Sequence, residues 1–450
     1  MFGYRKAGVN RSGVTALSRP LPLAFRLRER AFTGGRGRLV GELLLGLLVA
    51  VIAIVLLREP ARSQPFSIDE SRWIATSRYF WITVIDRDLF GPAWQPNYLV
   101  YTHPPVARYV IGFGLWLQGW TPEQLNGRYD SLEGRAFNER AGNIPGQELL
   151  AAARRVTFVF AVAAVILAYA VARTLGGILA GLATVAFVLV NPLLTTVWTR
   201  ALAESIVAAF GLLALLLALR TMPYVGALGH RAWLPLAVGT ALALAAATKL
   251  NGTIGALGLS VFALVQQAQS LARTRRTAGI RSWIDIGLAA VVVFVAVNPL
   301  LYVNPAERIV GLVQHRQTEM EFQRTVFSVQ AVPDDLPARV EHVAWRTFDT
   351  YATPHGSLPF STDALLVPLG LLVLGRRTLA DARRSWSGPP FLFLCWMVAT
   401  YAVVTPNLRF DSSHYFAPLV VLNVVASGLA VEALVGRAIR FGVLWRTRPT

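Results

Sequence analysis

Long apolar segments recur along this chain and restrict its fold more than any other feature. Of the 450 residues, 54% are apolar and only 15% are charged, and the mean hydropathy is +0.48. Soluble domains of this length are not so apolar, whereas about 20 consecutive apolar residues can cross a bilayer as a helix. We therefore predict an all-α polytopic membrane protein. The ten predicted spans are residues 39–57, 151–172, 178–198, 203–220, 233–248, 252–267, 283–303, 362–375, 390–405 and 415–435.

Arginine is concentrated between the apolar segments and sets the predicted orientation. The net charge of +18 would also suit a nucleic-acid-binding protein, but these arginines cluster in alternate short loops, as cytoplasmic loops of membrane proteins require. We predict no nucleic-acid partner and both termini inside. The inside clusters are Arg173; Arg220 and Arg231; Arg273, Arg275, Arg276 and Arg281; Arg376, Arg377, Arg383 and Arg384; and the tail from Arg437.

This orientation divides the chain into three parts. Residues 1–38 form a basic cytoplasmic arm, residues 39–435 form the transmembrane domain, and residues 436–450 form a basic tail. The first apolar segment exceeds the roughly 7–15 residues of a signal-peptide core, so we expect it to be retained as a span. The large outer loops are residues 58–150 and 304–360. We predict a multi-pass plasma membrane protein (the inner membrane of a bacterium) with its polar site facing outside.

One segment of the first outer loop could be an additional span, which would reverse the predicted orientation of all later loops. Residues 104–120 are nearly long enough to cross the bilayer, and a span there would move Arg173 and every later basic loop outside. The segment begins at a Pro-Pro pair and carries Trp116 and Trp120, which suit the membrane interface. We therefore expect an interfacial helix that lies on the membrane.

Two adjacent carboxylates, Asp69 and Glu70, follow the first predicted span. Ionisable residues at a membrane are costly and are usually functional. A carboxylate against an apolar wall has a raised proton affinity, which suits a general base, and the second carboxylate can orient it or bind metal. The alternative is that both residues belong to the acidic first turn of a helix that Ser67 caps.

A His-Pro-Pro sequence at residues 103–105 follows the acidic pair by some thirty residues. An Asp-Glu pair at the start of the first outer loop, then His-Pro-Pro and an aromatic-apolar helix, resembles the protein O-mannosyltransferases. More broadly it resembles the GT-C glycosyltransferases that use polyprenyl-phosphate sugars, with the aminoarabinose lipid A transferases as more distant relatives. Without this resemblance, His103 would be a structural histidine before a turn whose backbone the prolines restrict.

Later motifs occur in the order of the same family. Arg200 and Glu204 correspond to a basic and then an acidic residue, residues 248–252 (TKLNG) resemble a Thr-Lys-x-x-Gly turn, and residues 414–418 (HYFAP) resemble a His/Arg-Tyr-x-x-Pro motif. There are departures from the family pattern. Glu204 replaces the commoner Asp, Thr102 precedes His103 where an acidic residue is usual nearby, and the loop 304–360 is too short for the extra sugar-binding domain of eukaryotic members. These departures concern the acceptor more than the chemistry.

Each of these candidates also has a structural alternative. Arg200 and Glu204 are spaced to pair across one helical turn, so they can be an interfacial ion pair rather than a partner for Asp69. Lys249 can neutralise a lipid phosphate or extend as a snorkelling lysine at a helix end. Lys6 is the other lysine of the chain, which favours a special role for Lys249.

The sequence also contains a candidate site for a divalent metal ion. His315 and Glu319 share one face of a predicted helix and could form half of a divalent-metal site. The alternative is a solvated amphipathic helix. A comparable histidine in the aminoarabinose transferases keeps His315 as a metal candidate. Arg409 and His414 are further candidates for the outer polar site.

The resemblance implies transfer of a sugar from a polyprenyl-phosphate donor to a hydroxyl of a protein, lipid or glycan acceptor. Asp69 would be the general base of an inverting displacement, with Glu70 and Glu204 beside it. His103, Arg200, Lys249, Arg409 and His414 would bind substrate or lipid phosphate. The donor sugar, with mannose suggested by the family alone, is not determined.

Two other functions compete with this reading. A lipid-linked glycan flippase or other transporter would need ionisable residues near the bilayer midplane and often repeated halves. The charged residues here lie mainly at span ends, and no internal repeat is apparent. A non-catalytic scaffold is the remaining alternative. Cys395 is the single cysteine, so an intramolecular disulfide is excluded.

Overall fold

The computed structural model describes residues 36–221, 233–274, 279–353, 361–382 and 386–446. Most of the predicted cytoplasmic arm (1–35) and the last four residues of the predicted tail (447–450) lie outside the described residues, as do Arg231, Arg275, Arg276, Arg383 and Arg384. The chain divides into two units, Met1–Leu48 and Val49–Thr450. The described part of the first unit is the amino-terminal portion of helix α2 (Arg36–Ser63).

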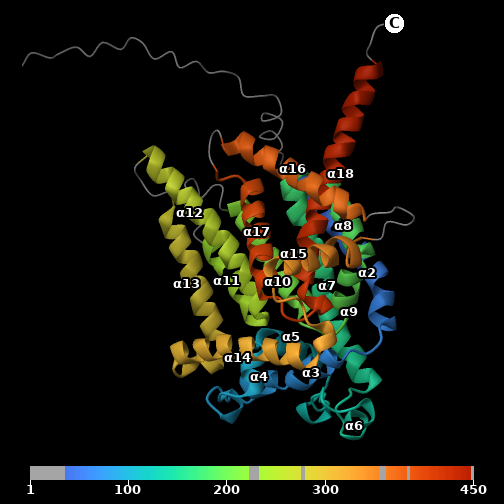
Figure 1. Ribbon diagram of the computed structural model, residues 1–450, viewed down its shortest axis with the longest axis vertical. Coiled ribbons are helices and arrows are strands. Elements are labelled where there is room, and N and C mark those ends of the chain that lie inside the picture. Colours follow the sequence, from blue (N-terminus) through green and yellow to red (C-terminus); the bar gives the residue numbers. More distant parts are fainter. Residues whose placement is uncertain (1–35, 222–232, 275–278, 354–360, 383–385, 447–450) are drawn as a thin grey trace, which may run out of the picture. The chain divides into compact units, whose positions relative to one another are not determined.

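The second unit is a bundle of long apolar helices with a layer of shorter helices at one end (Figure 1). After α2, the bundle helices are α7 (Gln147–Leu175), α8 (Ile178–Val190), α9 (Pro192–Thr199), α10 (Glu204–Thr221), α11 (Trp233–Thr248), α12 (Ile254–Thr274), α13 (Ile280–Ala296), α16 (Thr362–Ala382), α17 (Pro389–Asn407) and α18 (Ala417–Arg446). Each predicted span overlaps one of these helices or the pair α8–α9. The all-α class is therefore confirmed.

Six helices of the described residues are long and apolar enough to cross a membrane, or seven if a bent pair counts as one span. The bent pair is α8–α9, which turns by 72°. The bend follows from the local sequence, because Pro192 begins α9 and the Asn191 side chain caps it by accepting a hydrogen bond from Leu194 N at 3.0 Å. The protein is thus a multi-pass membrane protein, and the total of ten spans stays a prediction.

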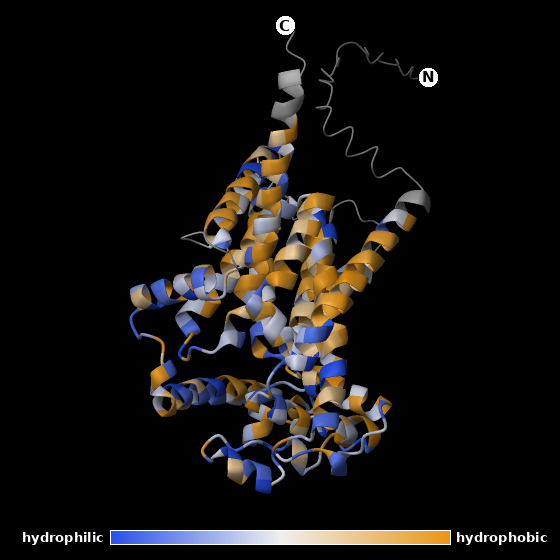
Figure 2. Cartoon of the chain, turned by 90° about the vertical axis from the view of Figure 1, so that its right-hand side faces the viewer, coloured by the Kyte–Doolittle hydropathy of each residue, from blue (hydrophilic) through white to orange (hydrophobic). Residues whose placement is uncertain are grey.

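The layer at the end of the bundle is more polar than the bundle itself, as the hydropathy colours show (Figure 2). Its helices are α3 (Ile68–Thr76), α4 (Tyr98–Thr102), α5 (Val106–Leu117), α6 (Arg135–Arg140), α14 (Pro305–Val326) and α15 (Leu336–Trp345). Helix α5 lies in the segment that could have been a span. Its 12 residues extend about 18 Å, too short for a hydrocarbon core of roughly 30 Å. Its apolar side, with Ile111 and Leu115 fully buried, packs on α3 and α7.

Helices α7, α10, α12 and α18 all begin toward the end that carries the polar layer (Figure 1). Three of them have an arginine in their last turn, namely Arg173, Arg220 and Arg273. The basic loops therefore gather at the opposite end from the acidic and histidine-containing segments, as predicted. Which end faces the cytoplasm stays a prediction.

Candidate active site

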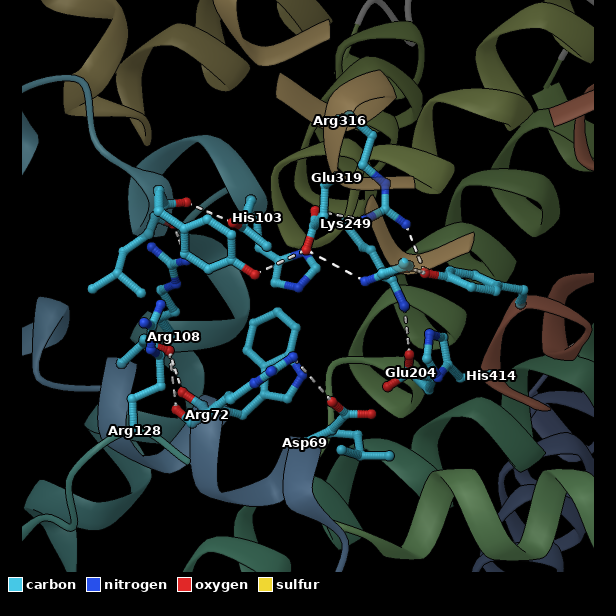
Figure 3. Close-up of a pocket in the computed structure, with 18 residues that line it drawn as sticks. Asp69, Arg72, His103, Arg108, Arg128, Glu204, Lys249, Arg316, Glu319 and His414 are labelled. Carbon is cyan, nitrogen blue, oxygen red and sulfur yellow. Dashed lines mark hydrogen bonds and ion pairs between the residues drawn. The ribbon is translucent and has the colours of Figure 1, made fainter. Parts of the chain in front are cut away.

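A narrow cavity of about 70 Å³ lies where the polar layer meets the bundle, and many of its walls are charged (Figure 3). It receives side chains from α3, the turn after α4, the start of α10, the turn after α11, helix α14 and the segment before α18. Its charged and histidine side chains are Asp69, Arg72, His103, Arg108, Arg128, Glu204, Lys249, Arg316, Glu319 and His414. Five predicted site residues, far apart in sequence, are thus brought to one cavity.

Asp69 lies in the first turn of α3 and lines the cavity. Its side chain keeps 35% of its accessible surface, and its nearest cation is Arg72, whose Nη1 is 3.8 Å from Asp69 Oδ1. Burial by the surrounding protein raises the pKa of Asp69, the Arg72 charge lowers it, and the Glu204 charge raises it again. A carboxylate with a raised pKa and an open side toward a cavity can accept a proton from a bound hydroxyl.

Glu70 points away from the cavity, although it follows Asp69 directly. Its side chain is fully buried and forms a two-pronged ion pair with Arg154 of α7, with both N–O distances at 2.7 Å. It also accepts hydrogen bonds from Ala201 N at 2.8 Å and from Ser67 N at 3.0 Å. The predicted pairing of the two carboxylates in one site is therefore not seen, because Arg154 and the Ala201 backbone hold the Glu70 side chain away from the cavity.

Glu204 and Lys249 form a buried ion pair on the cavity wall, with Lys249 Nζ 2.6 Å from Glu204 Oε1. The prediction that Arg200 and Glu204 lie one helical turn apart is wrong, because α10 begins at Glu204 and residues 201–203 are not helical. Arg200 is the C-cap residue that follows α9, and its carbonyl accepts a hydrogen bond from Thr157. It does not line the cavity.

Two cations converge on the ring of Tyr415. Lys249 Nζ lies 5.5 Å and Arg316 Cζ 5.7 Å from the ring centroid. Arg316 also donates to the Tyr415 hydroxyl and to Glu319, each at 2.8 Å. These contacts hold two positive charges at one side of the cavity, an arrangement that suits a phosphate group.

His103 and His414 line the same cavity. His103 stacks on Trp73 with ring centroids 4.8 Å apart, and His414 Nδ1 is 3.0 Å from Ser412 Oγ. Burial, and then repulsion from Lys249 and other nearby cations, holds the pKa of each imidazole well below its usual range. Both rings are therefore neutral at pH 7, and each can donate one hydrogen bond and accept another.

The residues around His315 do not fit the predicted metal site. His315 Nε2 lies 3.4 Å from Thr102 Oγ1, and its ring lies near Tyr98 and Tyr101. Glu319 is already paired with Arg316 and accepts from the Tyr98 hydroxyl at 3.1 Å. Within the described ranges, no three His, Cys, Asp or Glu side chains are grouped to hold a metal ion. We therefore assign no step to a divalent metal.

A larger cavity of about 630 Å³ adjoins the first and shares Lys249, Arg316 and Tyr415 with it. Arg409 lies on this second cavity, where it pairs with Asp334 at 3.5 Å, rather than on the first. A third, mainly apolar hollow lies among α10, α12, α17 and α18 and shares Glu204 and His414 with the first. The charged cavity thus adjoins a mainly apolar hollow between bundle helices.

Sequence reasoning missed several charged and aromatic walls of the cavity. They are Arg72, Tyr98, Arg108, Arg128, Arg316 and Tyr415. Tyr415 belongs to the HYFAP motif and Arg316 adjoins His315, so both were close to a named signal. Nothing local marks Arg108 or Arg128, since their place depends on how the first outer loop folds.

Comparison with known proteins extends these observations. No curated protein matches the sequence. Residues 94–308 match the family described as Dolichyl-phosphate-mannose-protein mannosyltransferase. The Archaeoglobus fulgidus oligosaccharyltransferase AglB, solved with an inhibitory peptide and a dolichol-phosphate, aligns at TM-score 0.54 and 13% identity, over 90% of this chain and 52% of AglB. The same enzyme tethered to an acceptor peptide aligns at TM-score 0.52 and 14% identity, over 89% and 51%.

ArnT from Cupriavidus metallidurans, solved with undecaprenyl phosphate, aligns at TM-score 0.46 and 16% identity, over 90% of this chain and 64% of ArnT. The chain therefore spans between about half and two thirds of the length of these solved proteins. The chain thus resembles the Dolichyl-phosphate-mannose-protein mannosyltransferase family over residues 94–308, and it shares the fold of the oligosaccharyltransferase AglB.

Proposed function

We propose that the protein transfers a sugar from a polyprenyl-phosphate donor to an acceptor hydroxyl at the extracytoplasmic membrane surface. One observation carries this proposal: a carboxylate, Asp69, and two cations, Lys249 and Arg316, line the same cavity at the end of a membrane-spanning bundle. Transfer from a phosphate donor needs a group that accepts a proton and groups that stabilise a departing phosphate. The cavity supplies both.

Asp69 is the proposed general base. It takes the proton of the acceptor hydroxyl while that oxygen attacks the anomeric carbon on the face opposite the phosphate. The bond to the polyprenyl phosphate breaks as the new glycosidic bond forms, so a single displacement inverts the anomeric centre. Glu204 supports this role from the cavity wall, because its negative charge helps to raise the pKa of Asp69.

Lys249 and Arg316 are the proposed phosphate-binding groups. The leaving phosphate gains negative charge, and charge-assisted hydrogen bonds to ammonium and guanidinium groups grow stronger as it does. Glu204 holds Lys249 in place, and Tyr415 and Glu319 hold Arg316. His103 and His414, which are neutral, are proposed to hydrogen-bond the sugar or the phosphate.

The hollow beside the cavity and the comparisons with known proteins support a binding path for the lipid tail and a class of donor sugar. The apolar hollow among α10, α12, α17 and α18 offers a path for a polyprenyl tail, and AglB, which shares the fold, was solved with a dolichol-phosphate. A mannosyl donor is supported by the family match to residues 94–308. Protein, lipid and glycan acceptors all remain compatible with the cavity.

Glu70 is proposed to position Asp69 rather than to react. It is tied to Arg154 of α7 and to the backbone of Ala201, so it fastens the first turn of α3 to the bundle. Arg200 and Arg409 do not line the cavity. We therefore propose that they influence the reaction without contacting the reacting groups.

Incubation of the purified protein with a panel of polyprenyl-phosphate sugars tests the proposed function. We expect release of free polyprenyl phosphate together with a new glycoside, unchanged by a chelator because the cavity does not fit a metal. Reconstitution in liposomes provides the comparison with a flippase. Movement of the lipid-linked sugar across the bilayer without bond formation would contradict the proposal.

The Arg72→Gln variant is expected to shift the acid side of the pH–rate profile to higher pH. A general base must be deprotonated, so the rate falls as the pH drops through its pKa. Burial raises the pKa of Asp69, and the Arg72 charge opposes that rise. Removal of this charge raises the pKa further. The measurement is kcat/KM against pH.

Arg78→Gln is the matched control for this shift. Arg78 is an exposed arginine of the same segment that bonds to the carbonyls of Ala75 and Asn126. Its loss should leave the profile in place. An acid limb that stays fixed or moves to lower pH in Arg72→Gln would exclude Asp69 as the group that titrates.

A further inference from the structure

A separate cavity lies at the opposite end of the bundle from the candidate active site. It has a volume of about 450 Å³ and is bounded by the start of α8, the middle of α16 and the later part of α18. These helix segments lie toward the end of the bundle away from the polar layer (Figure 1). Glu432 of this cavity lies fifteen residues along α18 from Ala417, or about 22 Å at 1.5 Å per residue. The two sites are therefore separated by most of the thickness of a membrane core.

The charge of this cavity is positive. Arg376, Arg377 and Arg437 face one acidic residue, Glu432. Arg377 is held in place, since it donates to the carbonyl of Leu175 at 2.5 Å and pairs with Glu432 at 3.4 Å. Arg376 and Arg437 are exposed and have no hydrogen-bond or ion-pair partner in the part of the chain that the structure describes.

The walls between these arginines are apolar and open. Leu372 of α16 is 60% exposed, Ile439 of α18 is 61% exposed, and Leu179 at the start of α8 is 38% exposed. Arginines that serve only to orient a membrane protein need neither a hollow nor a fixed neighbour such as Arg377. A ligand with a phosphate and an acyl chain would use both kinds of wall.

We propose that this cavity binds an anionic phospholipid of the leaflet opposite to the active site. Arg376 and Arg437 bind the phosphate with charge-assisted hydrogen bonds, and an acyl chain packs along Leu372 and Ile439. A soluble phosphate would leave the apolar walls exposed to water. The occupant is therefore a lipid rather than a free anion, and the site is independent of the proposed transferase reaction.

The test uses the full chain in phosphatidylcholine nanodiscs that contain dioleoylphosphatidylglycerol as the probe, with native mass spectrometry of the released protein. The double variant Arg376→Gln/Arg437→Gln is expected to retain phosphatidylglycerol roughly tenfold less well than the unmodified protein. The control Arg220→Gln/Arg281→Gln removes the same charge from exposed positions at the same end of the bundle, outside the cavity. It should retain the lipid normally.

Equal retention of phosphatidylglycerol by the cavity variant and the unmodified protein would contradict the proposed lipid site. Equal loss in the control variant would also overturn it, because the effect would then follow net charge alone. Glycerophosphate, which has the headgroup phosphate without acyl chains, identifies the kind of occupant. Displacement of the lipid by millimolar glycerophosphate would overturn a lipid site in favour of a free-phosphate site.

Discussion

Asp69→Asn is expected to lower the turnover of sugar transfer at least about a hundredfold, the lower range for loss of a positioned general base. Asparagine has nearly the shape of aspartate but cannot accept the proton of the attacking hydroxyl. Binding of the donor should change little, since Lys249 and Arg316 remain on the cavity wall. The measurement is the rate of polyprenyl phosphate release at saturating donor and acceptor, with donor binding measured separately.

Asp86→Asn is the matched control for this variant. Asp86 is an exposed aspartate of the same outer loop and does not line the cavity. Its replacement should leave turnover unchanged. Near-normal transfer by Asp69→Asn would remove Asp69 from the mechanism, while loss of donor binding in that variant would move its role from proton transfer to substrate binding.

Arg154→Met is expected to lower the free energy of unfolding by about 3–5 kcal/mol, the usual cost of removing one partner of a buried ion pair. Glu70 is fully buried and Arg154 is 7% exposed, so the carboxylate that remains cannot be solvated. The variant also removes the hydrogen bond from Arg154 to the carbonyl of Gln64. Equilibrium unfolding in mixed micelles with increasing SDS measures the loss.

Arg135→Met provides the comparison in the same loop. Arg135 pairs with Glu139 at 2.8 Å, but both side chains are more than half exposed, and exposed pairs contribute little. No measurable change in unfolding is expected. Equal stability of the two variants would show that the Glu70–Arg154 pair does not fasten α3. Arg154→Lys keeps the charge without the two-pronged contact, and it should recover only part of the stability.

The arrangement of Asp69 and Glu70 shows the limit of prediction from local sequence. Adjacent residues on a helix point about 100° apart, so two neighbouring carboxylates need not face the same cavity. Which one turned away depends on Arg154, 84 residues later in the chain. The first turn of α3 is both the predicted acidic helix start and the wall of the site, so the two interpretations of this motif are compatible.

The Arg200–Glu204 prediction failed for a related reason. It assumed a continuous helix, but the chain turns between α9 and α10. That turn leaves Glu204 at the first position of α10, where it meets Lys249 from the turn after α11. Sequence spacing describes neighbours within one helix and does not describe a contact made across a turn.

The sequence by itself determined the helical membrane fold and the segregation of arginines to one end. Its motifs, read with the family resemblance, also named Asp69, His103, Glu204, Lys249 and His414, which line the candidate cavity. These follow from apolar segment length, from charge distribution and from motifs that are local in the chain. Only the tertiary structure decided which charges meet. Arg316 reaches Tyr415 across 99 positions of sequence, and such partners depend on how helices pack, which no local pattern encodes.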